Sequence, residues 1–145
     1  SQIGWGNGIY AGETDGEAPR EYEPHYWYYA RNLLKTTPQQ ALPPGHTSLS
    51  SVMGMMQRRL QSRPGNLSTW EEVDKAGYVV VGSPETVRQR LEDYAKKVGF
   101  GLMIANFSVG NAPREYTEKS MKLFAEKVMP KLRGINVDAP AANAN

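Results

Sequence analysis

The chain has 145 residues, with 17 Lys and Arg against 15 Asp and Glu, and it contains no Cys. This length allows one domain with a core, while the net charge of +2 excludes the strongly basic surface typical of proteins that bind nucleic acid or anionic membranes. The lack of Cys excludes disulfides and Cys nucleophiles and fits a cytoplasmic location, and no segment has the roughly 18 apolar residues of a membrane span.

The N-terminal residues predict a strand. Residues 3–12 are rich in Gly and contain a short apolar stretch at positions 9–11. They lack the charged and apolar regions of a signal peptide. The chain begins at Ser1 without an initiator Met, as expected for part of a larger protein or for a processed chain.

Residues 20–35 predict a helix in spite of Pro24, with Asp15 as a candidate cap. Its apolar face is aromatic, and we expect it to pack on a sheet or to border a ligand pocket; the stripe consists of Tyr22, Tyr26, Tyr29 and Leu33. His25 has no Asp or Ser partner nearby in the sequence, which favours a structural or surface role.

Residues 36–69 are interrupted by several Pro and Gly residues around a short helical pattern at 49–61 that carries Met53 and Met56. Long connections of this kind are commonly functional lids, disordered segments or variable surface excursions. We expect a lid-like insertion within residues 38–76. A short helix at 70–76, capped by Thr69 or Ser68, ends this part of the chain.

A second strand is predicted at residues 79–81, because three successive Val residues bounded by Gly are typical of a strand buried on both sides. The helix that follows has Ser83 as its N-cap, Pro84 in its first turn and Gly99 as its left-handed end. Its predicted inner face consists of Val87, Leu91, Tyr94, Ala95 and Val98.

Residues 102–109 predict a third strand, and residues 111–113 begin the last helix. The predicted inner face of that helix consists of Met121, Phe124, Ala125, Val128 and Leu132. Residues 134–145 are small and predict a flexible tail after a domain of residues 1–133. Strands that alternate with helices through short links predict an α/β fold with parallel strands, either a doubly wound sheet or a barrel.

Candidate binding residues lie at the carboxyl ends of the strands, where α/β folds bind their ligands. Gly82 and Ser83 lead into a helix N-terminus, which either binds an anion such as a cofactor phosphate or only caps the helix. Asn106, Phe107 and Ser108 either line a substrate pocket or only end their strand. Alternation places Asn106 and Ser108 on one side of the strand and Phe107 on the other.

Several catalytic patterns are absent from the sequence. There is no dinucleotide-binding Gly motif, no phosphate-binding loop of nucleotide hydrolases and no zinc-protease motif. With only His25 and His46, a His-based metal site is not expected.

Three stretches of the sequence carry a family resemblance. They are Val81-Gly82-Ser83-Pro84-Glu85-Thr86-Val87, the apolar strand that follows Gly99 and ends in Phe107, and Ser120-Met121-Lys122-Leu123-Phe124 with its following Val128-Met129-Pro130 and Leu132. These stretches resemble the C-terminal part of the bacterial luciferase-like flavin-dependent monooxygenases. The aromatic helix around His25 and the turn at residues 11–15 are also similar to that family. The resemblance covers most of residues 9–133.

The resemblance implies that the chain is the incomplete C-terminal βα units of a (β/α)8 barrel of the TIM type, which typically has about 250 residues. It implies reduced FMN as cofactor and a small organic substrate. It also implies a flavin reductase as a further partner and a homo- or heterodimer. No catalytic residue of the family can be assigned to this chain, which would supply lid, pocket wall and barrel closure and be inactive alone.

Two alternatives remain open. One is an oxidoreductase of the same superfamily that uses a deazaflavin in place of FMN. The other is a non-catalytic half-barrel or partner subunit, which must cover the open edges of its sheet and is therefore expected to form a dimer or larger assembly.

Overall fold

A computed structural model describes residues 4–34, 48, 50, 53–54, 57, 67–133 and 135. Three parallel strands form its sheet in the order β2-β1-β3. They are β1 (Gly4–Ala11), β2 (Val79–Gly82) and β3 (Leu102–Asn106). The prediction of a parallel α/β fold is confirmed, and the Gly-rich N-terminal segment provides the central strand.

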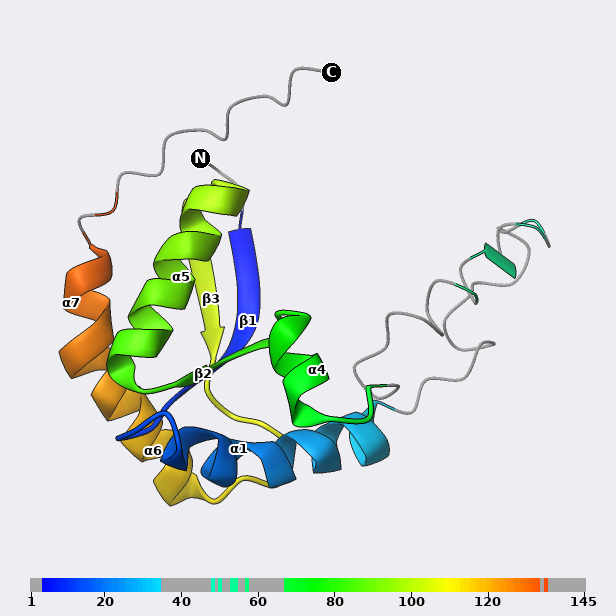
Figure 1. Ribbon diagram of the computed structural model, residues 1–145, viewed down its shortest axis with the longest axis horizontal. Helices are drawn as coiled ribbons and strands as arrows, with labels where there is room; N and C mark the ends of the chain where they lie inside the picture. The colour runs from blue at the N-terminus through cyan, green and yellow to red at the C-terminus, as the bar shows by residue number, and fades with distance from the viewer. Residues whose placement is uncertain are drawn as a thin grey trace.

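The helices cover both faces of this sheet. The helix α1 (Glu17–Tyr28) continues into a π-helical turn, η1 (Tyr29–Leu33), and α4 (Trp70–Lys75) precedes β2. The helix α5 (Pro84–Val98) joins β2 to β3, and the chain then forms α6 (Arg114–Leu123), the π-helical η3 (Phe124–Val128) and α7 (Met129–Leu132). Figure 1 shows α5 and α7 on one side of the strands and α4 on the other.

Alternation along the strands divides the core into two clusters. On one face, which we call the α1 face, Tyr10, Val79 and Val81 pack against α1 and α4. On the opposite face, the α5 face, Ile9, Ala11 and Val80 pack against α5 and the last helices. The apolar residues of β2 are therefore buried from both sides, as expected for a parallel sheet.

The strand order differs from that of consecutive barrel strands. Successive strands of a (β/α)8 barrel are neighbours, whereas β3 pairs with β1 and not with β2. The two connections therefore run in opposite directions across the sheet, which places α1 and α5 on opposite faces. Among the described residues, the sheet has a doubly wound order.

Most predicted helix ends are confirmed. Thr69 and Glu72 form a capping box at the start of α4, Ser83 caps α5, and Gly99 ends α5 with a φ of 71°. Asp15 does not cap α1, because the N-cap is Gly16 and makes no side-chain hydrogen bond. The third strand ends at Asn106, three residues before the predicted end.

The inner face of the last helix differs from the prediction. Ser120, Leu123, Phe124 and Val128 are buried, whereas Met121 is 49% exposed and Ala125 is also exposed. The π-helical turn at Phe124–Val128 changes the register within this helix, since its hydrogen bonds span five residues. Most of the predicted helix at 49–61, most of the lid-like insertion and the tail beyond residue 135 lie outside the described residues, while residues 50, 53, 54 and 57 are helical.

Candidate functional site

The carboxyl ends of the three strands meet at one end of the sheet, beside α1 and α6 (Figure 1). β1 extends beyond β3, because Gly8 pairs with Asn106 while Ala11 pairs with Gly82 of β2. The helix after β1 covers the α1 face, whereas the end of α6 and η3 pack on the α5 face, and in open α/β sheets ligands bind beside such a reversal of strand order. This end of the sheet is therefore the candidate functional site.

The space beyond the end of β1 holds a paired polar cluster. The hydroxyl of Tyr10 donates a hydrogen bond to Glu21 at 2.7 Å, and Lys119 of α6 donates to Glu21 at 2.8 Å and to Glu17. The hydroxyl oxygen of Ser120 accepts a hydrogen bond from the amide of Ala11 at 2.9 Å, where β3 no longer pairs with β1. The cluster joins α1 to α6.

The pKa shifts in this cluster keep each group in a single protonation state near neutral pH. Burial and the hydrogen bond to Glu21 raise the pKa of Tyr10 well above its usual range, so the phenol stays neutral. Burial acts to raise the pKa of Glu21, but hydrogen bonds from Lys119 and Tyr10 outweigh it and lower that pKa. Burial likewise acts against the charge of Lys119, and the two carboxylates outweigh it and raise the pKa of Lys119. None of these shifts moves a group toward neutral pH, where a general acid or base would titrate.

The predicted anion site at Gly82 and Ser83 already faces a carboxylate. The amide of Ser83 donates a hydrogen bond to Asp15 at 2.6 Å, and this bond lowers the pKa of Asp15. A Cβ added at Gly82 would lie 2.8 Å from Thr86 and 2.9 Å from Asp15. This arrangement does not fit an added flavin phosphate, because Asp15 would repel it. Binding of a cofactor here stays a prediction that requires Asp15 to move.

Of the three predicted pocket residues, two are accessible. Phe107 packs edge-on against Phe124 with ring centroids 5.2 Å apart, on the α5 face. Asn106 and Ser108 are exposed. Their role in substrate binding stays a prediction.

His25 contacts the loop that follows β3. Its Nδ1 atom lies 2.9 Å from Oδ1 of Asn111, and the ring centroids of His25 and Tyr116 are 6.1 Å apart. Gly110, with a φ of 54°, lies so close to the carbonyl of His25 that a side chain there would collide with it. The partner of His25 is 86 residues away in the sequence, so only the Gly at position 110 was a signal of this close approach.

The aromatic residues of α1 form a packed cluster with Trp70 of α4, and the expectation that some of these rings border a ligand pocket stays a prediction. Tyr26 lies edge-on to Trp27 and Trp70, with centroid distances of 5.3 and 5.8 Å, and Tyr22 is also adjacent. The hydroxyl of Tyr26 is buried and finds no hydrogen-bond partner among the described residues. Burial raises the pKa of Tyr26 to about 12.

One part of the α1 face is uncovered. Gly4 and Gly6 of β1 pair with Leu102 and Ile104 of β3, and these two apolar side chains are 60% and 63% exposed. Asn106 continues this row toward the carboxyl end. We call the surface formed by these five residues the open sheet face. β3 also has no further strand beside it among the described residues.

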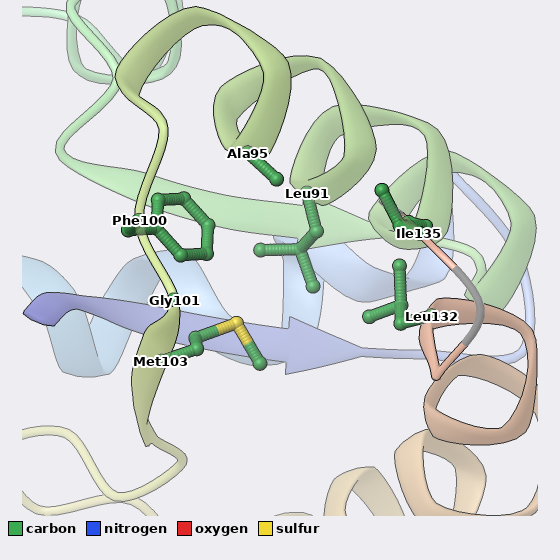
Figure 2. Close-up of a pocket in the computed structure, with 7 residues that line it drawn as sticks. All are labelled: Leu91, Ala95, Phe100, Gly101, Met103, Leu132 and Ile135. Atoms are coloured by element: carbon green, nitrogen blue, oxygen red, sulfur yellow. The ribbon is translucent and has the colours of Figure 1, made fainter. Parts of the chain in front are cut away.

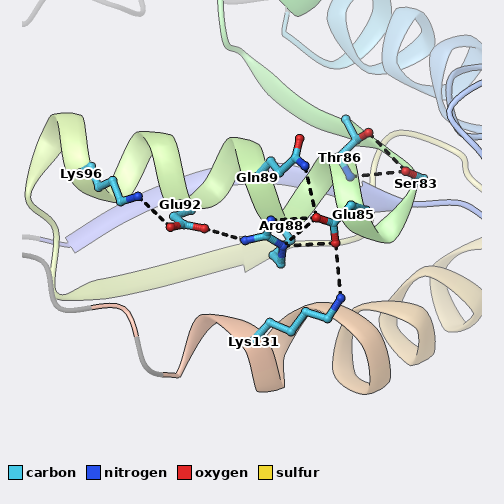
Figure 3. A network of polar contacts seen from close by, with 8 residues as sticks. All are labelled: Ser83, Glu85, Thr86, Arg88, Gln89, Glu92, Lys96 and Lys131. Atoms are coloured by element: carbon cyan, nitrogen blue, oxygen red, sulfur yellow. Dashed lines mark hydrogen bonds and ion pairs between the residues drawn. The ribbon is translucent and has the colours of Figure 1, made fainter.

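The charged residues of α5 form a ladder along its solvent side (Figure 3). Arg88 pairs with Glu85 at 2.7 Å and with Glu92 at 2.6 Å, and Lys131 of α7 lies 3.3 Å from Glu85. Arg88 lowers the pKa of Glu85 to about 2. A hollow of about 480 Å³ lies beside Glu85 and Lys131, but both charges are already paired. This surface is typical of a solvated helix face.

No group of three or more His, Asp or Glu side chains in the described ranges is arranged to hold a metal ion. Nor does any helix in these ranges combine the length and apolar character needed to cross a bilayer.

No known protein family matches the sequence, and no curated protein matches it either. Among solved structures, the chain is similar to the monooxygenase RslO1 from Streptomyces bottropensis, with a TM-score of 0.57 and 21% sequence identity. The similarity covers 90% of this chain and 31% of that one. The chain thus shares its fold with about a third of a monooxygenase.

Proposed function

We propose that this chain is part of a flavin-dependent monooxygenase of the luciferase-like kind. The similarity in fold to a part of a monooxygenase, over 90% of this chain, is the observation that carries the proposal. Reduced FMN would supply the chemistry that activates oxygen, and a small organic substrate would be oxidised. The whole enzyme would work in the reducing cytoplasm with a flavin reductase, in keeping with a chain that lacks Cys.

In this proposal, the residues described here contribute one wall of the site. Asn106 and Ser108 are neutral, exposed polar side chains at the carboxyl end of β3. They are suited to hydrogen bonds with an uncharged ring or a neutral substrate. The flavin phosphate would be held by polypeptide outside these residues, because Asp15 occupies the helix end at Ser83.

We extend the proposal to a barrel only for β1 and β3, which would be neighbouring barrel strands. Barrel helices all lie outside the strands, whereas α1 and α5 cover opposite faces of this sheet, so the open sheet face would be an inner face only if α1 left the α1 face. β2 pairs with β1 on the side away from β3, where the next barrel strand would otherwise pair. It would therefore be an added strand outside the barrel order.

Titration of reduced FMN into this chain and into the longer protein that we propose tests the function. We expect the longer protein to bind reduced FMN and to consume oxygen, and the chain alone to bind it at least a hundredfold more weakly. Tight binding by the chain alone would contradict the claim that the essential flavin site lies elsewhere. Activity with a deazaflavin only would favour the alternative oxidoreductase.

A non-catalytic partner subunit is the second candidate, and the exposed Leu102 and Ile104 beside an open strand edge favour it. Such a surface is expected to be covered by another chain. Light scattering after size exclusion tests this candidate, which requires a dimer or larger assembly. A stable, cooperatively folded monomer would count against it.

A further inference from the structure

A cavity of about 340 Å³ lies on the α5 face of the sheet, between α5, β3 and α7. Phe100 and Gly101, which lead into the first residues of β3, form part of its wall. Leu91 and Ala95 of α5 form a second wall. None of these lining residues belongs to the candidate functional site at the carboxyl ends of the strands.

The side chains around this cavity are all apolar. Figure 2 shows Leu91, Met103, Leu132 and Ile135 around one space, with Phe100 at its side. The stacking of Trp5 on Phe100, at 5.1 Å and 9°, supports that wall from β1. Leu91, Ala95 and Phe100 are 1%, 6% and 7% exposed, so the main walls belong to the packed core.

The charged residue of α5 that is adjacent to Ala95 in the sequence is already in an ion pair. Lys96 follows Ala95 in the sequence, but its ammonium pairs with Glu92 at 2.7 Å on the solvent side of the helix. Among the described residues, no charged side chain lines the cavity. A charged ligand would lose its hydration here without gaining a partner.

We propose that this cavity binds a small, uncharged, apolar molecule, such as a single aromatic ring or a short aliphatic chain. Its volume falls in the range of ligand cavities, roughly 300–1,000 Å³. An apolar guest gains dispersion contacts with the apolar side chains that line this space. The site is independent of the proposed monooxygenase function, since none of its lining residues belongs to the candidate functional site.

Methyl NMR of the 145-residue chain, with the Met methyl groups labelled, tests this site with toluene as the probe. Met103 lines the cavity, while Met121 and Met129 are exposed outside it and serve as internal controls. We expect toluene to shift the Met103 signal in a saturable way and to leave Met121 and Met129 unchanged. Benzoate, which adds a charge to the same ring, is expected to bind at least tenfold more weakly.

Ala95→Leu fills the cavity from α5 and is expected to weaken toluene binding at least tenfold. Ala125→Leu makes the same change at an exposed position of η3 and should leave binding unchanged. If Ala95→Leu fails to fold, Leu132→Phe fills the cavity from a half-buried position on the other wall. The site is refuted if toluene does not shift Met103, if it shifts the exposed Met residues equally, or if the filled variants bind toluene as the unmodified chain does.

Discussion

The Asp15 carboxylate joins the turn after β1 to the start of α5 through its hydrogen bond from the Ser83 amide. We expect Asp15→Asn to lower the free energy of unfolding by about 1 kcal/mol, because a charged acceptor is replaced by a neutral one on an exposed residue. Urea denaturation measures this change. Asp93→Asn, an exposed position on α5, is the matched control and should change stability by less than about 0.5 kcal/mol.

The same contact predicts a pH dependence. The Ser83 hydrogen bond lowers the pKa of Asp15 in the folded chain, below an unfolded value of about 3.9. The stabilisation is therefore complete above about pH 4 and is lost as the pH falls through the folded pKa. In Asp15→Asn, the part of the acid-induced loss of stability that comes from Asp15 should disappear. An identical pH profile in both proteins would contradict this assignment.

We expect the substitution of Tyr by Phe to have different effects on the free energy of unfolding at two buried positions. Tyr10→Phe removes a donor to Glu21 and should lower the free energy of unfolding by about 1–2 kcal/mol. Tyr26→Phe removes a buried hydroxyl without a partner among the described residues, and should leave stability unchanged or raise it. Thermal denaturation of the two variants side by side is the measurement, and a larger loss in Tyr26→Phe would overturn the assignment.

At the level of single residues, the helix caps could be predicted from the sequence. The caps at Thr69, Ser83 and Gly99 were predictable because each acts within a few residues of its own helix. The bond between Asp15 and Ser83 spans 68 residues, and that between Ala11 and Ser120 spans 109. No local sequence pattern indicates hydrogen bonds between residues so far apart, so the polar contacts of the candidate site could be identified only from the structure.

At the level of elements, helix faces were predictable where the helix is regular. In α5, the predicted Val87, Leu91 and Ala95 are buried, whereas Val98 at its end is 40% exposed. In the last helix, the π-helical turn breaks the period on which the prediction rests. Leu123 is buried in place of Met121 for this reason.

The loop after β3 depends on Gly110. Gly110→Ala combines an unfavourable positive φ with a collision against the carbonyl of His25, so we expect it to cost about 2 kcal/mol or more. Gly16→Ala is the control, because no atom lies within 4 Å of the added Cβ and its φ is −85°. Chemical denaturation compares them, and equal stabilities would show that the loop does not pack on α1 as described.

At the level of the whole molecule, the parallel sheet was predictable but the strand order was not. Apolar runs and caps establish which segments are strands and helices, and short links make the strands parallel. They do not say whether β3 lies beside β1 or beside β2. That choice depends on packing between Tyr10, Ile9 and helices distant in the sequence.

The open sheet face predicts self-association of the chain when it is alone. Replacing Leu102 and Ile104 together by Lys should reduce association at least tenfold, because their apolar side chains are exposed beside an open strand edge. Stability should change little, since neither side chain is buried. Val98→Lys, at a 40% exposed position on α5, is the control, and analytical ultracentrifugation is the measurement.

Hydrogen exchange of the β3 amides tests most directly whether this chain is one part of a larger enzyme that joins at β3. In a parallel edge strand, alternate amides face away from the sheet and exchange quickly. Our account predicts that the outward amides among residues 102–106 exchange at least a hundredfold more slowly in the longer protein than in this chain. Equal exchange in the two proteins would show that β3 is a free edge in both and would contradict the account.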